Sequence, residues 1–285
     1  MIKCIATDMD GTLLNMHEKV SEANKRAIEH AQSKGVEVVV ATGRSYLEAR
    51  HALDEAGLKC PVISINGAVV WDEEGEMVAS NPMDREDVER ARAVLDEADI
   101  YYEVYTNKGT YTYDKKVSIE TIVDLLVSAF PDVDPAYLEK RATERFDLGL
   151  VHVVPSYAEL FADENIQCFK MLVFSGDQDL LGHTGGKLKE HTSLTVSSSG
   201  KENLEITSPS AQKGIALEKF VAKRNIALSD TMAIGDSYND ISMFEKAGKA
   251  VAMGNAIADI QRFCDEVTLS NHEDGVAHAI EKALK

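Results

Sequence analysis

The sequence IKCIATDMDGTLL, residues 2–14, contains the elements that decide the fold. Its first six residues form a largely apolar stretch that stops at Asp8, as expected for a strand buried on both faces of a parallel sheet. Asp8 and Asp10 follow two residues apart, so their side chains can face the same side. Ligands of open parallel sheets bind beyond the carboxyl ends of the strands. We therefore expect a ligand site at these two aspartates.

Strands and helices alternate outward from this segment and again near the C-terminus, which is typical of right-handed βαβ units in a parallel sheet. Ser21 can cap the first helix and Gly35 can end it. Asn66-Gly67 predicts a hairpin turn. The predicted strands are 2–7, 36–41, 61–65, 68–71, 231–234, 249–253 and 266–269, and the predicted helices are 21–34, one ending near 56, 214–224, 240–247, 257–263 and 274–284.

The middle of the chain has a different pattern. Its predicted helices are 84–98, 117–129 and 135–145, and its predicted strands are 100–106, 110–113, 168–174, 194–197 and 203–207. Three glycines, Gly182, Gly185 and Gly186, interrupt the helix expected near 177–190. We therefore expect an α/β protein whose doubly wound parallel-sheet core comprises residues 1–83 and 208–285, with residues 84–207 as an inserted α+β domain.

Charge and cysteine content narrow the choice of partners. Forty-eight acidic residues against 30 basic ones give a formal charge of -18, which repels nucleic acid and anionic membranes. No apolar run reaches the ~18 residues of a membrane span, and the chain reaches Asp8 too soon for a signal peptide. The four cysteines are far apart and form no CxxC pair. We expect a cytoplasmic protein with free thiols, either a monomer or a small homo-oligomer.

Four short polar clusters lie at or near the ends of predicted strands: DMDGT at 8–12, TGR at 42–44, Lys213-Gly214 and GDSYND at 235–240. Each cluster alone has a simpler explanation as a turn, a helix cap or a solvated helix start. Together, in one order and at strand ends, they favour catalysis. Asp236 and Asp240 would enter the same crevice as Asp8, so at least three carboxylates gather there.

Crowded carboxylates in a crevice of low dielectric cannot all stay ionised unless something offsets their repulsion. A hard divalent cation does so, and oxygen ligands indicate magnesium. Such a set suits phosphoryl transfer. One aspartate attacks phosphorus, while a second carboxyl protonates the leaving oxygen and later activates water.

These clusters resemble the four motifs of the haloacid dehalogenase (HAD) superfamily. The insert is similar to the C2B cap of the Cof-type (subfamily IIB) phosphatases, and the resemblance includes Asn66-Gly67 and AMGNA at 252–256. It implies a Rossmann-like core and a Mg²⁺-dependent phosphatase that hydrolyses phosphate monoesters of small metabolites through an aspartyl-phosphate. The implied substrates are sugar phosphates, flavin mononucleotide (FMN), pyridoxal phosphate or related compounds.

The resemblance also implies roles for single residues. Asp8 would be the nucleophile and a magnesium ligand, and Asp10 the general acid and base, with its backbone carbonyl on the metal. Whether Arg44, beside the second motif, touches substrate stays open. The phosphate group would be bound by the backbone amides of Met9 and Gly43 and the side chains of Thr42, Lys213 and Asn239. Asp236 would hold magnesium directly or through Ser237, with Asp240 and Thr12 in support.

The motifs also bear on alternative functions inside and outside this superfamily. Asp10 favours a phosphatase or phosphomutase over dehalogenases, which lack this acid, and over transport ATPases, which have Thr there. A phosphomutase of the phosphomannomutase type and a non-catalytic phosphometabolite-binding regulator stay open. The chain has no GxGxxG or GxxxxGK[ST] for nucleotides, no HExxH for zinc and no GxSxG for a serine hydrolase.

Tyrosines are concentrated in one stretch of the insert. Five of the nine lie within 13 residues: Tyr101, Tyr102, Tyr105, Tyr111 and Tyr113. Tyrosine suits a half-exposed hairpin, because its ring packs on the sheet and its hydroxyl can reach water. We favour this interpretation over a wall that stacks on the ring of a substrate.

Overall fold

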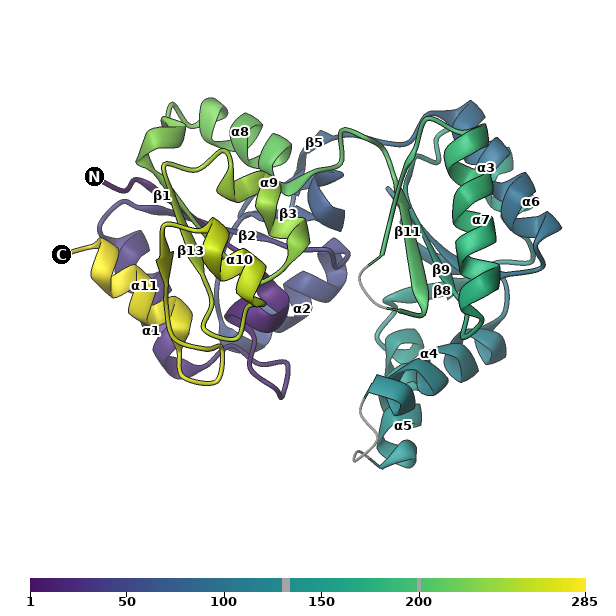
Figure 1. The fold of residues 1–285 in the computed structure, drawn as a ribbon, viewed down its shortest axis with the longest axis horizontal. Helices are drawn as coiled ribbons and strands as arrows, with labels where there is room; N and C mark the ends of the chain where they lie inside the picture. The colour runs from purple at the N-terminus through teal and green to yellow at the C-terminus, as the bar shows by residue number, and fades with distance from the viewer. Residues whose placement is uncertain (130–133, 199–200) are drawn as a thin grey trace. The chain divides into compact units, whose positions relative to one another are not determined.

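The computed structural model describes residues 1–129, 134–198 and 201–285. The chain divides into two compact units, one made of Met1–Asn81 with Ser210–Lys285 and the other of Pro82–Pro209 (Figure 1). We call the first unit the core and the second the insert. Within the described ranges, no helix is long and apolar enough to cross a membrane.

The core contains one eight-stranded sheet with the order β14-β13-β12-β1-β2-β3-β4-β5. Its strands are β1 (Cys4–Thr7), β2 (Glu37–Ala41), β3 (Val62–Ser64), β4 (Val69–Trp71), β5 (Met77–Ser80), β12 (Thr231–Gly235), β13 (Lys249–Ala252) and β14 (Glu266–Val267). The strands from β14 to β3 pair in parallel, and β4 and β5 add an antiparallel edge. Strand order runs outward from β1 in both directions, so β1 lies at the topological switch point where such sheets bind ligands.

The core helices are α1 (Glu22–Ser33), α2 (Tyr46–Ala56), α8 (Lys213–Lys223), α9 (Ile241–Phe244), α10 (Ala258–Phe263) and α11 (Gly275–Ala283). Ser21 caps α1 by accepting a hydrogen bond from the backbone of Asn24, and Gly57 ends α2 at a left-handed φ of 68°. Helix α1 packs on α11 on one side of the sheet, and α8 packs on α9 on the other (Figure 1). Helix α9 is shorter than predicted.

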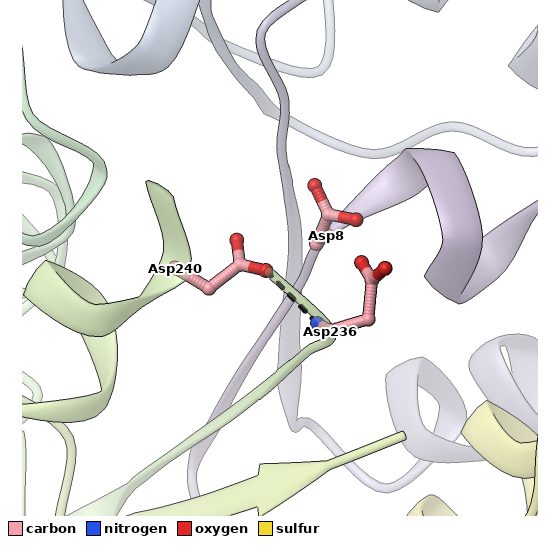
Figure 2. Close-up of side chains that lie close together, drawn as sticks. All are labelled: Asp8, Asp236 and Asp240. Carbon is pink, nitrogen blue, oxygen red and sulfur yellow. Dashed lines mark hydrogen bonds between the residues drawn. The ribbon is translucent and has the colours of Figure 1, made fainter. Parts of the chain in front are cut away.

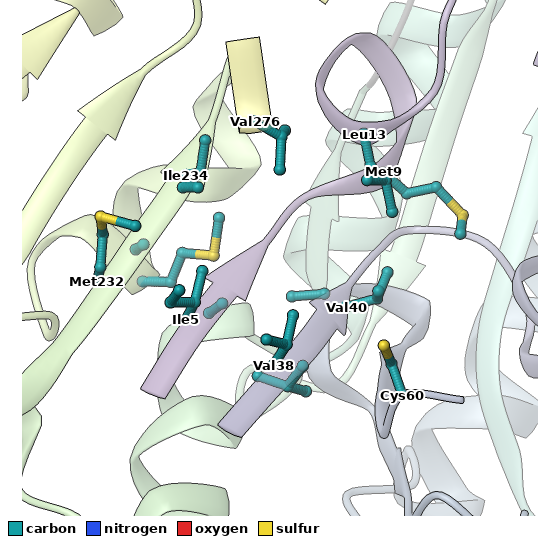
Figure 3. Packing of buried hydrophobic residues seen from close by; sticks show 14 of the residues in the cluster. Ile5, Met9, Leu13, Val38, Val40, Cys60, Met232, Ile234 and Val276 are labelled. Atoms are coloured by element: carbon teal, nitrogen blue, oxygen red, sulfur yellow. The ribbon is translucent and has the colours of Figure 1, made fainter. Parts of the chain in front are cut away.

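Apolar side chains of the central strands fill both faces of the sheet. Ile5, Val38 and Ile234 are buried, as predicted from their largely apolar runs (Figure 3). Met9 and Leu13, which follow β1, point into the same cluster (Figure 3). Fully burying one such side chain stabilises the fold by roughly 1.5–3 kcal/mol. The loop after β1 is therefore anchored in the core at two points.

The insert has a six-stranded sheet of order β10-β11-β9-β6-β7-β8, antiparallel except where β7 pairs with β8. Its elements are α3 (Arg85–Glu97), β6 (Tyr101–Thr106), β7 (Gly109–Thr112), α4 (Lys115–Ala129), α5 (Pro135–Asp147), β8 (Val151–Val153), α6 (Tyr157–Ala162), β9 (Cys168–Phe174), α7 (Gln178–His191), β10 (Thr195–Ser197) and β11 (Asn203–Thr207). Three short elements, β5, β8 and α6, were not predicted, because none spans enough residues to show a hydrophobic period.

The tyrosines of the insert differ in their surroundings. Tyr102 is buried in the hydrophobic cluster of the insert, where its ring centroid lies 4.6 Å from that of Tyr157. Its hydroxyl donates a hydrogen bond to Asp96, at 3.1 Å. The ring of Tyr113 is 41% exposed and meets Tyr157 edge-on. Tyr102 thus serves the packing of the insert, whereas Tyr113 presents its ring to solvent.

The expectation that three glycines interrupt the helix near 177–190 is wrong, because α7 runs without a break from Gln178 to His191. Leu181 and Leu188 are buried from this helix and hold it on the insert. A helical glycine costs only about 1 kcal/mol relative to alanine, so tertiary packing can outweigh that cost.

Alanine in place of glycine should have opposite effects in α7 and α8. A Cβ at Gly182 would have no heavy atom within 4 Å, so Gly182→Ala should stabilise the protein by about 0.5–1 kcal/mol. A Cβ at Gly214 would lie 1.8 Å from the carbonyl oxygen of Ser242, so Gly214→Ala should cost at least about 1–3 kcal/mol. Urea denaturation of both variants measures the free energy of unfolding, and changes of equal sign would contradict this packing.

Candidate active site at the end of β1

Asp8 and Asp236 meet because they follow two neighbouring parallel strands. The backbone N–H of Asp8 donates to the carbonyl of Ile234 in β12, at 2.9 Å. Asp8 is buried, and one carboxylate oxygen from each of Asp8, Asp236 and Asp240 lies within 4.8 Å of the other two. Figure 2 shows the three carboxyl groups gathered at this edge of the sheet. The structure therefore brings together the three carboxylates that the sequence predicted.

Lys213, the first residue of α8, is fully buried beside two of them. Its Nζ lies 2.6 Å from Oδ1 of Asp8 and 2.6 Å from Oδ1 of Asp240. Burial lowers the pKa of Lys213, but the two carboxylates outweigh burial and hold the pKa above its usual value. Lys213 therefore carries a fixed positive charge. Gly214 has no side chain and so lets α8 approach the backbone of Ser242.

Asp240 uses both of its carboxylate oxygens within the protein. While Oδ1 accepts from Lys213, Oδ2 accepts from the backbone amides of Asp236 and Ser237, at 2.9 and 3.0 Å. Gly235 makes room for this arrangement, because a Cβ there would lie 2.4 Å from Oδ2. Asp240 thus shapes the 235–240 loop, and Asp8 and Asp236 are the carboxylates that could hold a metal ion.

The DMDGT turn supports Asp236 from the other side. The Thr12 hydroxyl donates to Oδ1 of Asp236, at 3.1 Å. Gly11 has a φ of 75°, and a Cβ there would lie 2.5 Å from Oδ2 of Asp236. Glycine is required at this position by both its backbone angle and the approach of the carboxylate. Burial, with a smaller effect from Asp240, raises the pKa of Asp236 to about 6.

The residues present fit a magnesium ion. Oδ2 of Asp8 is buried and has no hydrogen-bond partner among the described residues. Burial raises the pKa of Asp8 well above its usual range, Lys213 opposes this, and Asp240 and Asp236 add to it. A buried carboxylate oxygen without a partner is costly, and a hard cation with oxygen ligands would satisfy it. Asp8 and Asp236 are therefore the residues that would hold Mg²⁺.

Three of the residues predicted to bind phosphate, Thr42, Gly43 and Asn239, follow strands β2 and β12. Thr42 is buried after β2, and its carbonyl accepts from the backbone of Asn66, at 2.9 Å. The side-chain Oδ1 of Asn66 accepts from Nδ2 of Asn239, at 3.2 Å, and a Cβ at Gly43 would lie 3.2 Å from the same oxygen. Asn66 thus lies close to Gly43 and accepts a hydrogen bond from Asn239. The sequence indicated Asn66 only as a turn residue, since nothing local shows which loop its side chain reaches.

Met9 and Ser237 each have only part of their polar or side-chain groups available to a ligand. The side chain of Met9 is buried in the core, which leaves only its backbone for a ligand. The backbone amide of Ser237 donates to Asp240, and the residue is exposed. Both positions are therefore compatible with contact to a ligand only through the groups that remain, the Met9 amide and the Ser237 hydroxyl or carbonyl.

Asp10 differs from the other carboxylates. Its side chain is 53% exposed and is held by Arg44, with Nη2 2.6 Å from Oδ1 and Nε 2.9 Å from Oδ2. The carboxylate cluster of the described residues contains Asp8, Asp236 and Asp240 but not Asp10. The structure therefore places Asp10 on Arg44, and Arg44 acts as its charge partner. The sequence showed that Arg44 belongs to the TGR cluster, but it gave no sign of the contact between Arg44 and Asp10.

Comparison with known proteins shows the family to which the chain belongs. Residues 5–280 match the family of haloacid dehalogenase-like hydrolases. The chain is 40% identical to phosphatase YwpJ of Bacillus subtilis (strain 168), over 99% of this chain and 100% of that one. It is 37% identical to 5-amino-6-(5-phospho-D-ribitylamino)uracil phosphatase YwtE of the same organism, over 99% and 98%. A solved haloacid dehalogenase-like hydrolase from B. subtilis matches with a TM-score of 0.86 and 39% identity, over 98% and 99%.

The chain therefore belongs to the haloacid dehalogenase-like hydrolases, and it is a hydrolase of phosphoric monoesters. A solved sugar phosphatase of HAD subclass IIB shares the fold, with a TM-score of 0.74 and 21% identity over 98% of each chain. The family, the Cof-type subfamily and the α/β fold class expected from the sequence are confirmed.

Removal of the buried ammonium should destabilise the protein strongly. Lys213→Met keeps the apolar stem but leaves Asp8 and Asp240 without their shared positive charge, which should cost about 3–5 kcal/mol. Lys219→Met, on the exposed side of the same helix, should change stability by less than about 0.5 kcal/mol. Urea denaturation at neutral pH without added metal measures both. Equal stability of the two variants would contradict the role of Lys213.

Proposed function

We propose that the protein is a Mg²⁺-dependent phosphatase that hydrolyses phosphate monoesters of small metabolites through an aspartyl-phosphate on Asp8. One observation carries the proposal. Asp8 is buried at the switch point of the sheet, with one oxygen on Lys213 and the other without a partner among the described residues. Lys213 at one oxygen and a metal ion at the other would keep the Asp8 carboxylate ionised, and a buried carboxylate beside fixed positive charge suits attack on phosphorus.

The first half-reaction forms the phosphoenzyme. Magnesium held by Asp8 and Asp236, with the Asp10 carbonyl and Ser237 as further candidates, would supply positive charge against the oxygens of the phosphate. Thr42, Lys213, Asn239 and the amides of Met9 and Gly43 would bind those oxygens. A carboxylate oxygen of Asp8 attacks phosphorus, the bond to the ester oxygen breaks, and the Asp10 carboxyl gives that oxygen its proton.

The second half-reaction regenerates the enzyme. Asp10, now ionised, removes a proton from water, whose oxygen attacks phosphorus and displaces the Asp8 carboxylate as inorganic phosphate forms. Asp10 must leave Arg44 to take part, because Arg44 binds both of its oxygens in this structure. The exposed position of Asp10 supports such a movement. Arg44 would then hold Asp10 in a resting position, away from the leaving group.

We infer that the substrate is a small phosphorylated metabolite and that the insert selects it as a cap. The relative YwtE is named for a phosphorylated ribitylaminouracil, which supports an ester with a polyol or sugar chain. Sugar phosphates, FMN and pyridoxal phosphate complete the panel for testing. We also propose a cytoplasmic location, which the four free cysteines support.

The test is a screen of purified protein against this panel, with release of inorganic phosphate as the readout. Hydrolysis of at least one ester with Mg²⁺ supports the proposal. Movement of the phosphoryl group from one position of a sugar phosphate to another, without release of phosphate, would indicate a phosphomutase. Binding without turnover would indicate a phosphometabolite-binding regulator.

Metal removal should abolish turnover. Without a cation, Asp8 and Asp236 repel each other and the phosphate of the substrate, so EDTA should stop phosphate release and Mg²⁺ should restore it. Mg²⁺ should also raise the midpoint of thermal unfolding, because it binds the folded protein only. Full activity in thoroughly metal-stripped protein would refute the magnesium-dependent mechanism.

Substitution should separate the two catalytic aspartates. Asp8→Asn removes the nucleophile, so no phosphoenzyme should form. Asp10→Asn keeps the nucleophile but removes proton transfer, which typically costs ~10²–10⁴-fold in rate. Asp54→Asn, an exposed aspartate on α2, is the control and should keep wild-type turnover. Acid-quench trapping of phosphoenzyme and steady-state rates measure the effects, and wild-type turnover in Asp10→Asn would exclude its acid–base role.

A further inference from the structure

The segment AMGNA at 252–256 begins with the last residue of β13 and reaches the DMDGT turn through Asn255. Its Asn255 joins two loops. The side-chain Nδ2 donates to the carbonyl of Gly11, at 2.8 Å, and Oδ1 accepts from the backbone N–H of Asn271, at 2.9 Å. Asn255 itself is exposed and belongs to no helix or strand. Its amide therefore connects the end of β13 directly to the turn that follows β1.

The Gly11 carbonyl belongs to the peptide unit that joins Gly11 to Thr12. Both residues touch Asp236: the Thr12 hydroxyl donates to its Oδ1 at 3.1 Å, and Gly11 lies against its Oδ2. A rotation of this peptide unit would move the Thr12 hydroxyl and close the space that the glycine leaves. The orientation of Asp236 therefore depends on the orientation of the Gly11–Thr12 peptide.

Two other asparagines hold the carbonyls farther along the same loop. Asn24 donates to the carbonyl of Leu13, at 3.2 Å, and Asn271 donates to that of Leu14, at 2.9 Å. These two are buried and fasten the loop to α1 and to the segment before α11. Asn255 is the one of the three whose acceptor residue, Gly11, contacts Asp236.

We propose that Asn255 is a positioning residue for the metal site: it fixes the Gly11–Thr12 peptide and thereby keeps the carboxylate of Asp236 turned toward Asp8. This inference rests on the proposed function, since it assigns Asn255 to the magnesium site. Residues that orient the ligands of a metal ion commonly change its affinity about 10–100-fold when they are removed. Asn255 should therefore control how tightly Mg²⁺ binds.

The chain offers variants that separate the two hydrogen bonds of Asn255. Asn255→Ala removes both. Asn255→Asp keeps the acceptor for Asn271 and loses the donor to Gly11, while its added negative charge alone would tighten binding of a cation. Gln261→Ala is the matched control, because Nε2 of Gln261 donates to the carbonyl of Gly254, at 2.9 Å, and holds the same loop by another bond.

The experiment is calorimetric titration of the full chain with Mg²⁺, without substrate. Asn255→Ala and Asn255→Asp should each weaken Mg²⁺ binding about tenfold, and Gln261→Ala should bind as the wild type does. The Mg²⁺ concentration for half-maximal phosphate release should rise by the same factor. Thermal unfolding in EDTA shows whether the variants fold. If Asn255→Ala does not fold, the Mg²⁺ affinity of Asn255→Asp tests the inference.

Wild-type Mg²⁺ affinity in the folded Asn255 variants would overturn this inference. Equal weakening in Gln261→Ala would overturn it too, because the effect would then belong to the loop as a whole. A wild-type chain that binds no Mg²⁺ would instead overturn the proposed function, and the role of Asn255 would fall with it. The failure of one is therefore distinguishable from the failure of the other.

Discussion

The pair of ionic contacts made by the buried Lys213 is the constraint on which the site depends. An ammonium group in a protein interior loses its hydration, and it stays charged here because Asp8 and Asp240 each contact it at 2.6 Å. The same contacts join the end of β1, the start of α8 and the 235–240 loop, which are far apart in the sequence. Gly214 and Gly235 are the small residues that let these segments approach.

This arrangement explains how an acidic protein can handle a phosphorylated substrate. The formal charge of -18 repels anions at long range, so local positive charge must act against it. Lys213 supplies one such charge, and the Asp8–Asp236 pair creates a place for a second in the form of a divalent cation. Arg44 neutralises Asp10 next to the site, which removes one further negative charge.

Much of the fold could be predicted from the sequence because its signals are local. Strands buried on both faces give largely apolar runs, as at β1 and β2, and helix ends such as Ser21 and Gly57 satisfy backbone groups within a few residues. The short elements β5, β8 and α6 left no such signal. The glycines of α7 gave a misleading signal. Their low helix propensity suggested a break in the helix, but the packing of α7 on the insert keeps it continuous.

The sequence by itself determined which polar residues follow the strands, and parallel pairing then brings Asp8 to Asp236, because neighbouring strands end at the same edge. Only the tertiary structure decided how each side chain is used. Asp240 gives both oxygens to Lys213 and backbone amides, Asp10 lies on Arg44, and Asn255 reaches Gly11. These choices depend on side-chain direction and on hydrogen-bond partners up to 244 residues away. Such contacts leave no periodic pattern in the sequence, because they involve single residues brought together only when the sheet has formed.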